Sequence, residues 1–267
     1  MDLRSRFGFH ATPFTREIGV EHHFRLPWLD ETLDALVGCI ERRMSAALIA
    51  PPGSGKTALS RRLTHTLPEA RYQVTYVKVT SLSKRDMCRE ICRACGAKPA
   101  GSFPALVDRL QERFTQTSGT EGRRPVVVLD EAHDLRPDVL AMLRILTNFE
   151  WDSQLVVSLL LVGQMPLRRM LASEEQEAVA RRLAHIATLR LLSREETIRY
   201  VEHRCAIAGA ATVPFDDAAV DAIYELGRGN LRATDRLALE ALLLCDRQGH
   251  GVVGPIHVTT ARRNLWP

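Results

Sequence analysis

The strongest constraint on the fold is one short segment, Ala50-Pro51-Pro52-Gly53-Ser54-Gly55-Lys56-Thr57. The apolar run Met44 to Ile49 before it predicts a buried strand, and Ala58 to Leu63 after it predict the start of a helix. A strand, a glycine-containing loop and a helix in this order form a phosphate-binding loop, or P-loop. The two glycines let backbone N–H groups curl around phosphate oxygens, and the helix N-terminus favours negative charge. The sequence therefore predicts a chain that binds a nucleoside triphosphate.

The polar residues of this loop suit phosphate chemistry. Lys56 can reach the β- and γ-phosphates, and Thr57 can offer its hydroxyl to Mg²⁺. Ala50 stands where the motif usually begins with glycine, but this position closes the strand and lies farthest from the γ-phosphate. We therefore expect ATP and Mg²⁺ as ligands, with nucleotide contacts from Pro52, Gly53, Ser54, Gly55, Lys56, Thr57 and Ala58.

A second motif begins at Pro125. Val126 to Leu129 predict a strand buried on both faces, as in a parallel sheet, and the strand ends in Asp130 and Glu131. Parallel sheets place ligands beyond the carboxyl ends of their strands. We expect Asp130 to hold Mg²⁺, directly or through water, and Glu131 to orient or deprotonate the attacking water.

The rest of the chain predicts three parts: an irregular arm over 1–28, an α/β nucleotide-binding domain over 29–191, and a small helical domain over 192–267. Further strands are expected at Tyr72–Val79, Leu155–Val162 and around His185–Leu189, a helix at Asp138–Phe149 and an exposed loop at Thr117–Arg124. Gln164, after the strand at 155–162, is placed to sense the γ-phosphate or position the water.

Both ends of the chain leave alternatives open. Phe7, Phe9 and Phe14 in the arm either pack onto the nucleotide domain, clamp the adenine, or cover other apolar surface. The segment Thr259–Pro267 ends in an apolar pair that either docks a partner or packs on the helical domain.

Composition narrows the class of protein only slightly. The net charge of +4 neither requires nor excludes a nucleic-acid partner. No apolar run is long enough to span a membrane and the N-terminus lacks a signal-peptide pattern, so we expect a cytoplasmic protein with no membrane partner. Cys88, Cys92 and Cys95 share a helical face, which allows a metal site or a buried stripe; no nearby His or second Cys pair completes a ligand set, which favours the stripe.

One segment is suited to double-stranded DNA. It contains the basic residues Lys78, Lys84, Arg85 and Arg89 and the hydroxyls Thr80, Ser81 and Ser83. Such side chains contact phosphates and sugars without reading sequence. The alternative is an ordinary solvated helix face.

Together these motifs resemble AAA+ ATPases: a P-loop, an acidic strand end, Gln164 at another strand end, the pair Arg181-Arg182 before the last strand, and a helical domain bearing Arg232. The resemblance covers nearly the whole chain and is closest to the group containing the transposition regulators TnsC, TniB and IstB and the secretion-associated ATPase ExeA. Phe7-Gly8-Phe9, Pro13-Phe14 and Leu161-Val162-Gly163-Gln164 are similar to that group.

The resemblance implies an α/β P-loop fold, with a five-stranded parallel sheet flanked by helices and a C-terminal all-helical lid. It implies that Gln164 is sensor 1 and that Arg232 is sensor 2, although Leu231 stands where the group more often has proline. It also implies that Arg182, or else Arg181, is an arginine finger that completes the site of a neighbouring subunit in a ring or helical filament.

Three functions remain compatible with this resemblance. The first is a DNA-bound regulator that recruits or activates a DDE transposase, with or without a targeting factor, and disassembles on ATP hydrolysis. The second is a secretion or cell-envelope ATPase like ExeA, and the third is a nucleotide-switched adaptor or loader.

Overall fold

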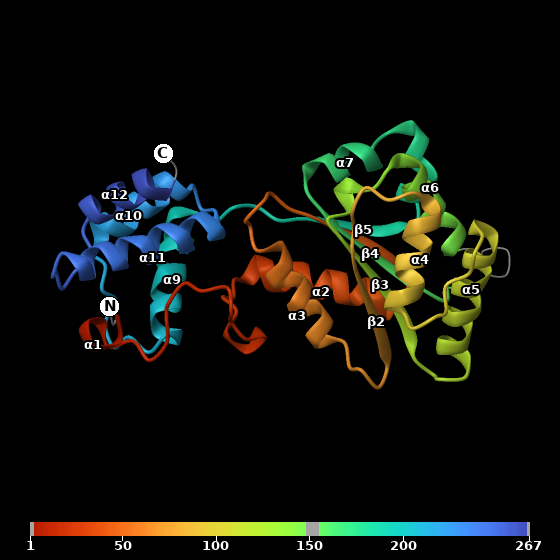
Figure 1. Cartoon of the computed structure of the whole chain (residues 1–267), viewed down its shortest axis with the longest axis horizontal. Coiled ribbons are helices and arrows are strands. Elements are labelled where there is room, and N and C mark those ends of the chain that lie inside the picture. The colour runs from red at the N-terminus through yellow and green to blue at the C-terminus, as the bar shows by residue number, and fades with distance from the viewer. Residues whose placement is uncertain (1–2, 148–154, 266–267) are drawn as a thin grey trace. The chain divides into compact units, whose positions relative to one another are not determined.

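The structure is a computed structural model and describes residues 3–147 and 155–265. The chain divides into two compact units. An α/β unit comprises Leu26–Pro51 and Lys56–Leu189, and a helical unit comprises the N-terminal arm up to Arg25, Pro52–Gly55, and the chain from Arg190. The helices and strands of both units are labelled in Figure 1.

The α/β unit contains one parallel sheet of five strands in the order β2-β3-β4-β1-β5. Its strands are β1 (Ser45–Ile49), β2 (Tyr72–Lys78), β3 (Arg124–Asp130), β4 (Ser158–Gly163) and β5 (Leu183–Thr188). Strands β1, β3 and β4 are buried almost throughout, because helices cover both faces of the sheet. The expected five-stranded parallel sheet is therefore confirmed.

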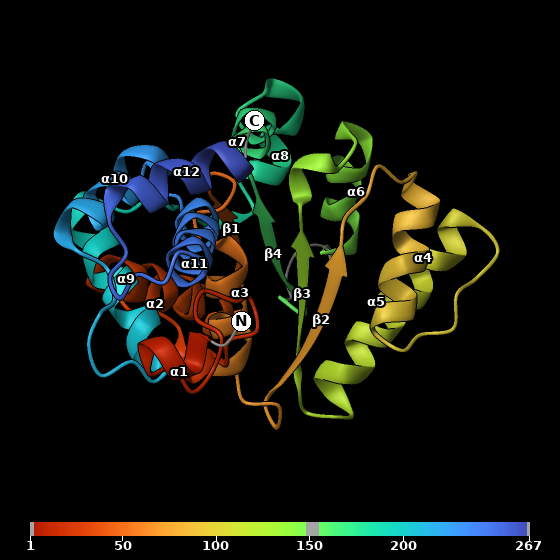
Figure 2. The ribbon, with the colours of Figure 1, turned by 60° about the vertical axis from the view of Figure 1, so that its left-hand side comes forward.

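Alternate residues of these strands feed two apolar cores. Val127 and Leu129 lie in the core with helices α4 (Lys84–Ala94), α5 (Phe103–Gly119) and α6 (Pro137–Leu146). Val126 and Val128 lie in the core with α2 (Pro27–Glu41) and α3 (Lys56–Thr66). Because side chains alternate along a strand, one continuous apolar run serves both faces. Figure 2 shows α2 and α3 on one side of the sheet and α4 and α5 on the other.

Shorter elements complete the α/β unit. They are the 3-10 helix η2 (Ala132–Asp134), α7 (Met165–Leu171), the 3-10 helix η4 (Glu174–Gln176) and α8 (Glu177–Ala180). Helix α5 continues for three residues into the segment expected to be an exposed loop. Thr117 in this last part of the helix is buried, and its hydroxyl donates to Gln73 Oε1 at 2.8 Å, which holds the segment against β2. The expected end of the α6 helix at Phe149 lies outside the described residues.

The helical unit contains α1 (Leu3–Phe7), the 3-10 helix η1 (Val20–His22), α9 (Arg194–Ile207), α10 (Asp217–Gly227), α11 (Leu231–Arg247) and α12 (Pro255–Leu265). Ser193 begins α9 with a capping box, in which its side chain accepts from Glu196 N and the Glu196 side chain accepts from Ser193 N. Phe7, Phe9 and Phe14 are buried in this unit, and Phe14 meets Phe215 edge to face. Of the alternatives for the arm aromatics, the structure shows that these three cover apolar surface within the helical unit.

The segment 259–265 belongs to a helix that the sequence pattern did not predict. Val258 and Ala261 of α12 are buried in the core of the helical unit, so this segment packs on that unit. Trp266 and Pro267 lie outside the described residues.

Candidate nucleotide-binding site

The P-loop has the backbone geometry that phosphate binding requires. Gly53 and Gly55 have φ values of +75° and +95°, a region that only glycine enters without strain. Lys56 begins α3, where its side chain is 8% exposed, and its carbonyl accepts from Ser60 Oγ. Thr57 is exposed at the next position.

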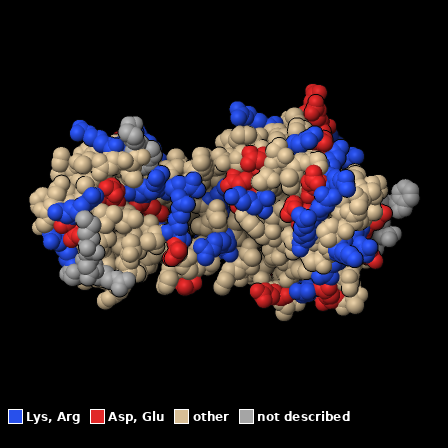
Figure 3. Space-filling view, viewed as in Figure 1, with Lys and Arg blue, Asp and Glu red and all other residues tan. Residues whose placement is uncertain are grey.

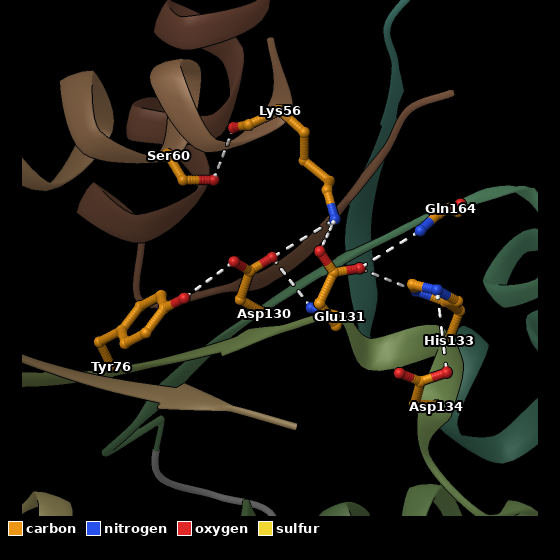
Figure 4. A network of polar contacts seen from close by, with 8 residues as sticks. All are labelled: Lys56, Ser60, Tyr76, Asp130, Glu131, His133, Asp134 and Gln164. Atoms are coloured by element: carbon orange, nitrogen blue, oxygen red, sulfur yellow. Dashed lines mark hydrogen bonds and ion pairs between the residues drawn. The ribbon is translucent and has the colours of Figure 1, made fainter. Parts of the chain in front are cut away.

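Lys56 faces the two carboxylates at the end of β3 (Figure 4). Its Nζ lies 2.9 Å from Glu131 Oε1 and 3.5 Å from Asp130 Oδ1. Glu131 has φ +57°, an unusual conformation for a residue with a side chain and one that is often found at functional sites. This backbone turn directly follows the end of β3, and the Glu131 carboxylate there forms an ion pair with Lys56.

The second oxygen of Glu131 meets two further side chains. Gln164 Nε2 donates to Glu131 Oε2 at 3.4 Å, and His133 Nδ1 lies 3.4 Å from the same oxygen. Burial of Glu131 raises its pKa, but the hydrogen bond and charge of Lys56, followed by Gln164 and His133, outweigh burial and hold the pKa below its ordinary range. Glu131 is therefore a carboxylate at neutral pH, as a group that orients or accepts a proton from water must be.

His133 and Tyr76 also lie at this site, although the sequence pattern assigned neither of them a role. His133 follows Glu131 by two residues within the same tight turn, and that spacing is the signal that could have found it. Tyr76 lies on β2, and its hydroxyl donates to Asp130 Oδ2 at 2.8 Å. Nothing in the β2 sequence marks Tyr76 as different from an ordinary strand tyrosine.

The oxygen donors at this site fit a magnesium ion. Asp130 and Thr57 supply a carboxylate and a hydroxyl, and Mg²⁺ is usually held by one or two protein oxygens together with water and phosphate. Within residues 3–147 and 155–265, no cluster of three or more His, Cys, Asp or Glu side chains forms a metal cage. Cys88, Cys92 and Cys95 are buried in the apolar core, and burial raises the pKa of each thiol, so the expectation of core packing holds.

Pro52–Gly55 also have partners within the helical unit. Asn230 Nδ2 donates to Pro52 O at 2.7 Å, and Arg232 N donates to Gly53 O at 3.3 Å. A Cβ on Gly53 would lie 2.2 Å from Asn230 Oδ1, which is a second reason for glycine there. The backbone of Arg232 thus contacts the P-loop, while its side chain is exposed.

The two candidate finger arginines differ in their surroundings. Arg181 is 77% exposed and pairs with Glu177 at 2.6 Å, one turn earlier on α8. Arg182 is half-buried at the start of the segment leading into β5. Arg181 therefore forms a surface ion pair, which is an ordinary structural role for an exposed arginine.

The basic segment expected to bind DNA is exposed but partly paired. Lys84 lies 3.8 Å from Asp138, and Arg89 pairs with Asp86 at 2.8 Å. Figure 3 shows acidic and basic side chains intermixed over this part of the α/β unit. Lys78 and Arg85 are exposed, and neither forms an ion pair with a described residue. The surface is therefore less basic than the sequence suggests, with Lys78 and Arg85 as its available cations.

A parallel sheet of this order, a P-loop on β1 and an acidic end on β3 are the features of an AAA+ ATPase. Comparison with known proteins agrees, since residues 40–171 match the family model of the AAA domain. The chain is 32% identical over 205 residues to the general secretion pathway protein A of Aeromonas hydrophila. That match covers 75% of this chain, and the chain spans 37% of the length of that relative.

Solved structures share the fold at low sequence identity. Cdc6p from Pyrobaculum aerophilum has a TM-score of 0.73 and 19% identity, covering 94% of this chain and 70% of that one. The ORC1 protein of Aeropyrum pernix, solved in complex with DNA, has a TM-score of 0.70 and 19% identity over 94% of this chain and 68% of that one. The RuvB Holliday junction branch migration motor of Thermotoga maritima has a TM-score of 0.60 and 19% identity, over 95% and 72%. Within the described residues, no helix combines the length and apolar character needed to cross a bilayer.

Proposed function

We propose that this chain hydrolyses ATP and uses the nucleotide as a switch for assembly on double-stranded DNA, where it recruits or activates a transposase. Hydrolysis then drives disassembly. The observation that carries the proposal is the register of the sheet, in which Lys78 pairs directly with Asp130. The basic segment therefore begins on the strand next to Asp130. A structural change at the nucleotide site can thus be transmitted to the basic segment.

The ATPase part of the proposal rests on five side chains. Lys56 and the P-loop N–H groups hold the phosphates, and Glu131, ionised at neutral pH, orients the attacking water. Gln164 holds the second oxygen of Glu131 and so fixes its orientation. Mg²⁺ held by Thr57 and Asp130 would neutralise charge on the β- and γ-phosphates.

The assembly part assigns Arg182 as the finger that enters the site of a neighbouring copy. The resemblance favours Arg182 over Arg181, and Arg181 pairs with Glu177 on the preceding turn. Arginine fingers are worth about 10³–10⁵ in rate in related phosphoryl-transfer systems, so isolated subunits should hydrolyse ATP slowly. Arg232, next to Asn230 and the P-loop, is the proposed second sensor.

DNA binding would use the exposed face that starts at Lys78. Its five basic and two acidic residues over 78–93 leave a net positive surface, with Thr80 and Ser81 exposed beside them. Such contacts are with phosphates and sugars, which gives weak dependence on target sequence. Proteins of the same fold include one solved in complex with DNA and one named as a Holliday junction branch migration motor, which is compatible with this use of the fold.

A second candidate function is that of a secretion or cell-envelope ATPase. The relative at 32% identity carries a general-secretion name, and that observation favours it. In this case the chain would hydrolyse ATP in the same site, but DNA would have no effect on its rate.

Titration with duplex DNA separates the two candidates. ATPase rate and DNA affinity are measured at low and high salt for the wild type and for Lys84→Glu/Arg85→Glu. We expect DNA to stimulate the wild type, salt to weaken binding, and the double charge reversal to reduce affinity about tenfold or more, since binding of this kind is dominated by phosphate contacts.

The matched control is Lys98→Glu/Arg109→Glu, which makes the same charge change on exposed residues outside the segment. It should bind DNA nearly as well as the wild type. No DNA effect on a wild type that hydrolyses ATP at low salt would reject the transposition function and favour the secretion function.

A further inference from the structure

Tyr76 combines an exposed ring with an inward-pointing hydroxyl. Tyr76 as a whole is 54% exposed, yet its hydroxyl points to the nucleotide site and donates to Asp130 Oδ2 at 2.8 Å (Figure 4). The register explains this reach: Tyr76 pairs with Val128, so Asp130 is its diagonal neighbour two residues further along β3. Diagonal neighbours on one face of a sheet are within reach of a long aromatic side chain.

The hydroxyl of Tyr76 completes the set of donors that hold the Asp130 carboxylate. Oδ1 accepts from Glu131 N at 2.9 Å and faces Lys56 Nζ at 3.5 Å. Oδ2 accepts from Tyr76. The Asp130 side chain is only 7% exposed, so rotation of the carboxylate would cost hydrogen bonds that water replaces poorly.

We propose that Tyr76 is a positioning residue that orients Asp130 for the divalent cation bound with the nucleotide. This inference rests on the proposed function, because it assumes that Asp130 contributes to Mg²⁺ binding. Groups that hydrogen-bond a metal ligand fix its orientation, and their loss typically costs about 10–100-fold in metal affinity. Since Tyr76 is half exposed and water can partly replace it, we expect the lower end of that range.

The hydroxyl stays a donor throughout the working pH range. The ordinary pKa of a tyrosine phenol is about 10. A phenol with this pKa is protonated at neutral pH and can donate to a carboxylate.

The test measures how much Mg²⁺ tightens nucleotide binding. The dissociation constant of a non-hydrolysable ATP analogue is measured with EDTA and with saturating Mg²⁺, and the ratio of the two is compared between the wild type and Tyr76→Phe. We expect Tyr76→Phe to lower this ratio about tenfold while leaving the constant in EDTA unchanged. A loss of general packing would weaken binding equally in both conditions.

The same strand supplies the control. Tyr72 is buried and its hydroxyl has no hydrogen-bond partner among the described residues, so Tyr72→Phe removes an equal group without touching Asp130. Its ratio should match that of the wild type. If the wild type shows Mg²⁺-dependent tightening and Tyr76→Phe shows the same ratio, the inference is wrong and the proposed function stands; a wild type that binds no nucleotide overturns both.

Discussion

Glu131 and Lys56 restrain each other when no nucleotide is present, and this predicts an unusual mutant phenotype. Lys56 must leave Glu131 to reach a phosphate, so the 2.9 Å ion pair opposes nucleotide binding. Replacing Glu131 with Gln keeps the shape of the side chain and removes its charge. Glu131→Gln should therefore bind ATP more tightly than the wild type, even before hydrolysis is considered.

The size of this effect follows from the surroundings of the pair. A hydrogen bond to a charged group contributes about 1.5–3 kcal/mol. Glu131 is 28% exposed and Lys56 8%, so solvent screens the pair in part and about 1–2 kcal/mol is appropriate. That range corresponds to about 5–30-fold in affinity.

Isothermal titration of ATP in EDTA measures the effect without the metal or turnover. The control is Asp134→Asn, which removes a charge from the same turn at a side chain that is 55% exposed and forms no ion pair with Lys56. Its affinity should equal that of the wild type. Equal or weaker ATP binding by Glu131→Gln would refute the argument that the pair restrains Lys56.

Three further predictions follow from the structure. Mixing Lys56→Ala with Arg182→Ala subunits should restore ATP hydrolysis that neither shows alone, whereas Arg181→Ala should keep most activity; no gain in any mixture would contradict the finger assignment. Phe114→Ala should lower the free energy of unfolding by about 3–5 kcal/mol in guanidinium titrations, because Phe114 is 2% exposed in the core, and Phe114→Leu should cost less. The pKa of Tyr76 is raised above its ordinary value of 10 to about 12, so the stability gained from its hydrogen bond is complete below pH 10 and lost as pH rises toward 12. The stability difference between the wild type and Tyr76→Phe should shrink over that window, and a constant difference would contradict this.

The two nucleotide motifs could be predicted from the sequence because each is a continuous stretch. The P-loop needs glycine at positions of positive φ, and the β3 strand needs an unbroken apolar run before its acids. Local chain signals of this kind do not depend on which other segments lie nearby. The parallel sheet could be predicted for the same reason, because each buried strand is one continuous apolar run.

The features that the sequence did not reveal depend on distant segments. The hydrogen bond from Tyr76 to Asp130 exists because β2 and β3 pair in one particular register. The burial of Phe14 against Phe215 depends on an arm packing with helices some 200 residues later. Helix α12 was missed because Thr259, Thr260 and two arginines obscure the apolar pattern formed by Val258 and Ala261.

Charge in the basic segment was overestimated for a related reason. A count of Lys and Arg takes no account of partners, and Asp138, which lies near Lys84, comes from another helix. The pairing of Arg89 with Asp86 lies within one helix at a spacing of three residues and was visible in the sequence.

Sedimentation velocity with a non-hydrolysable ATP analogue, Mg²⁺ and duplex DNA tests the central claim, that nucleotide bound at Lys56 and Asp130 drives assembly on DNA. The account predicts large assemblies for the wild type only when nucleotide and DNA are both present, and none for Lys56→Ala. A wild type that remains monomeric with both ligands at saturation would contradict it.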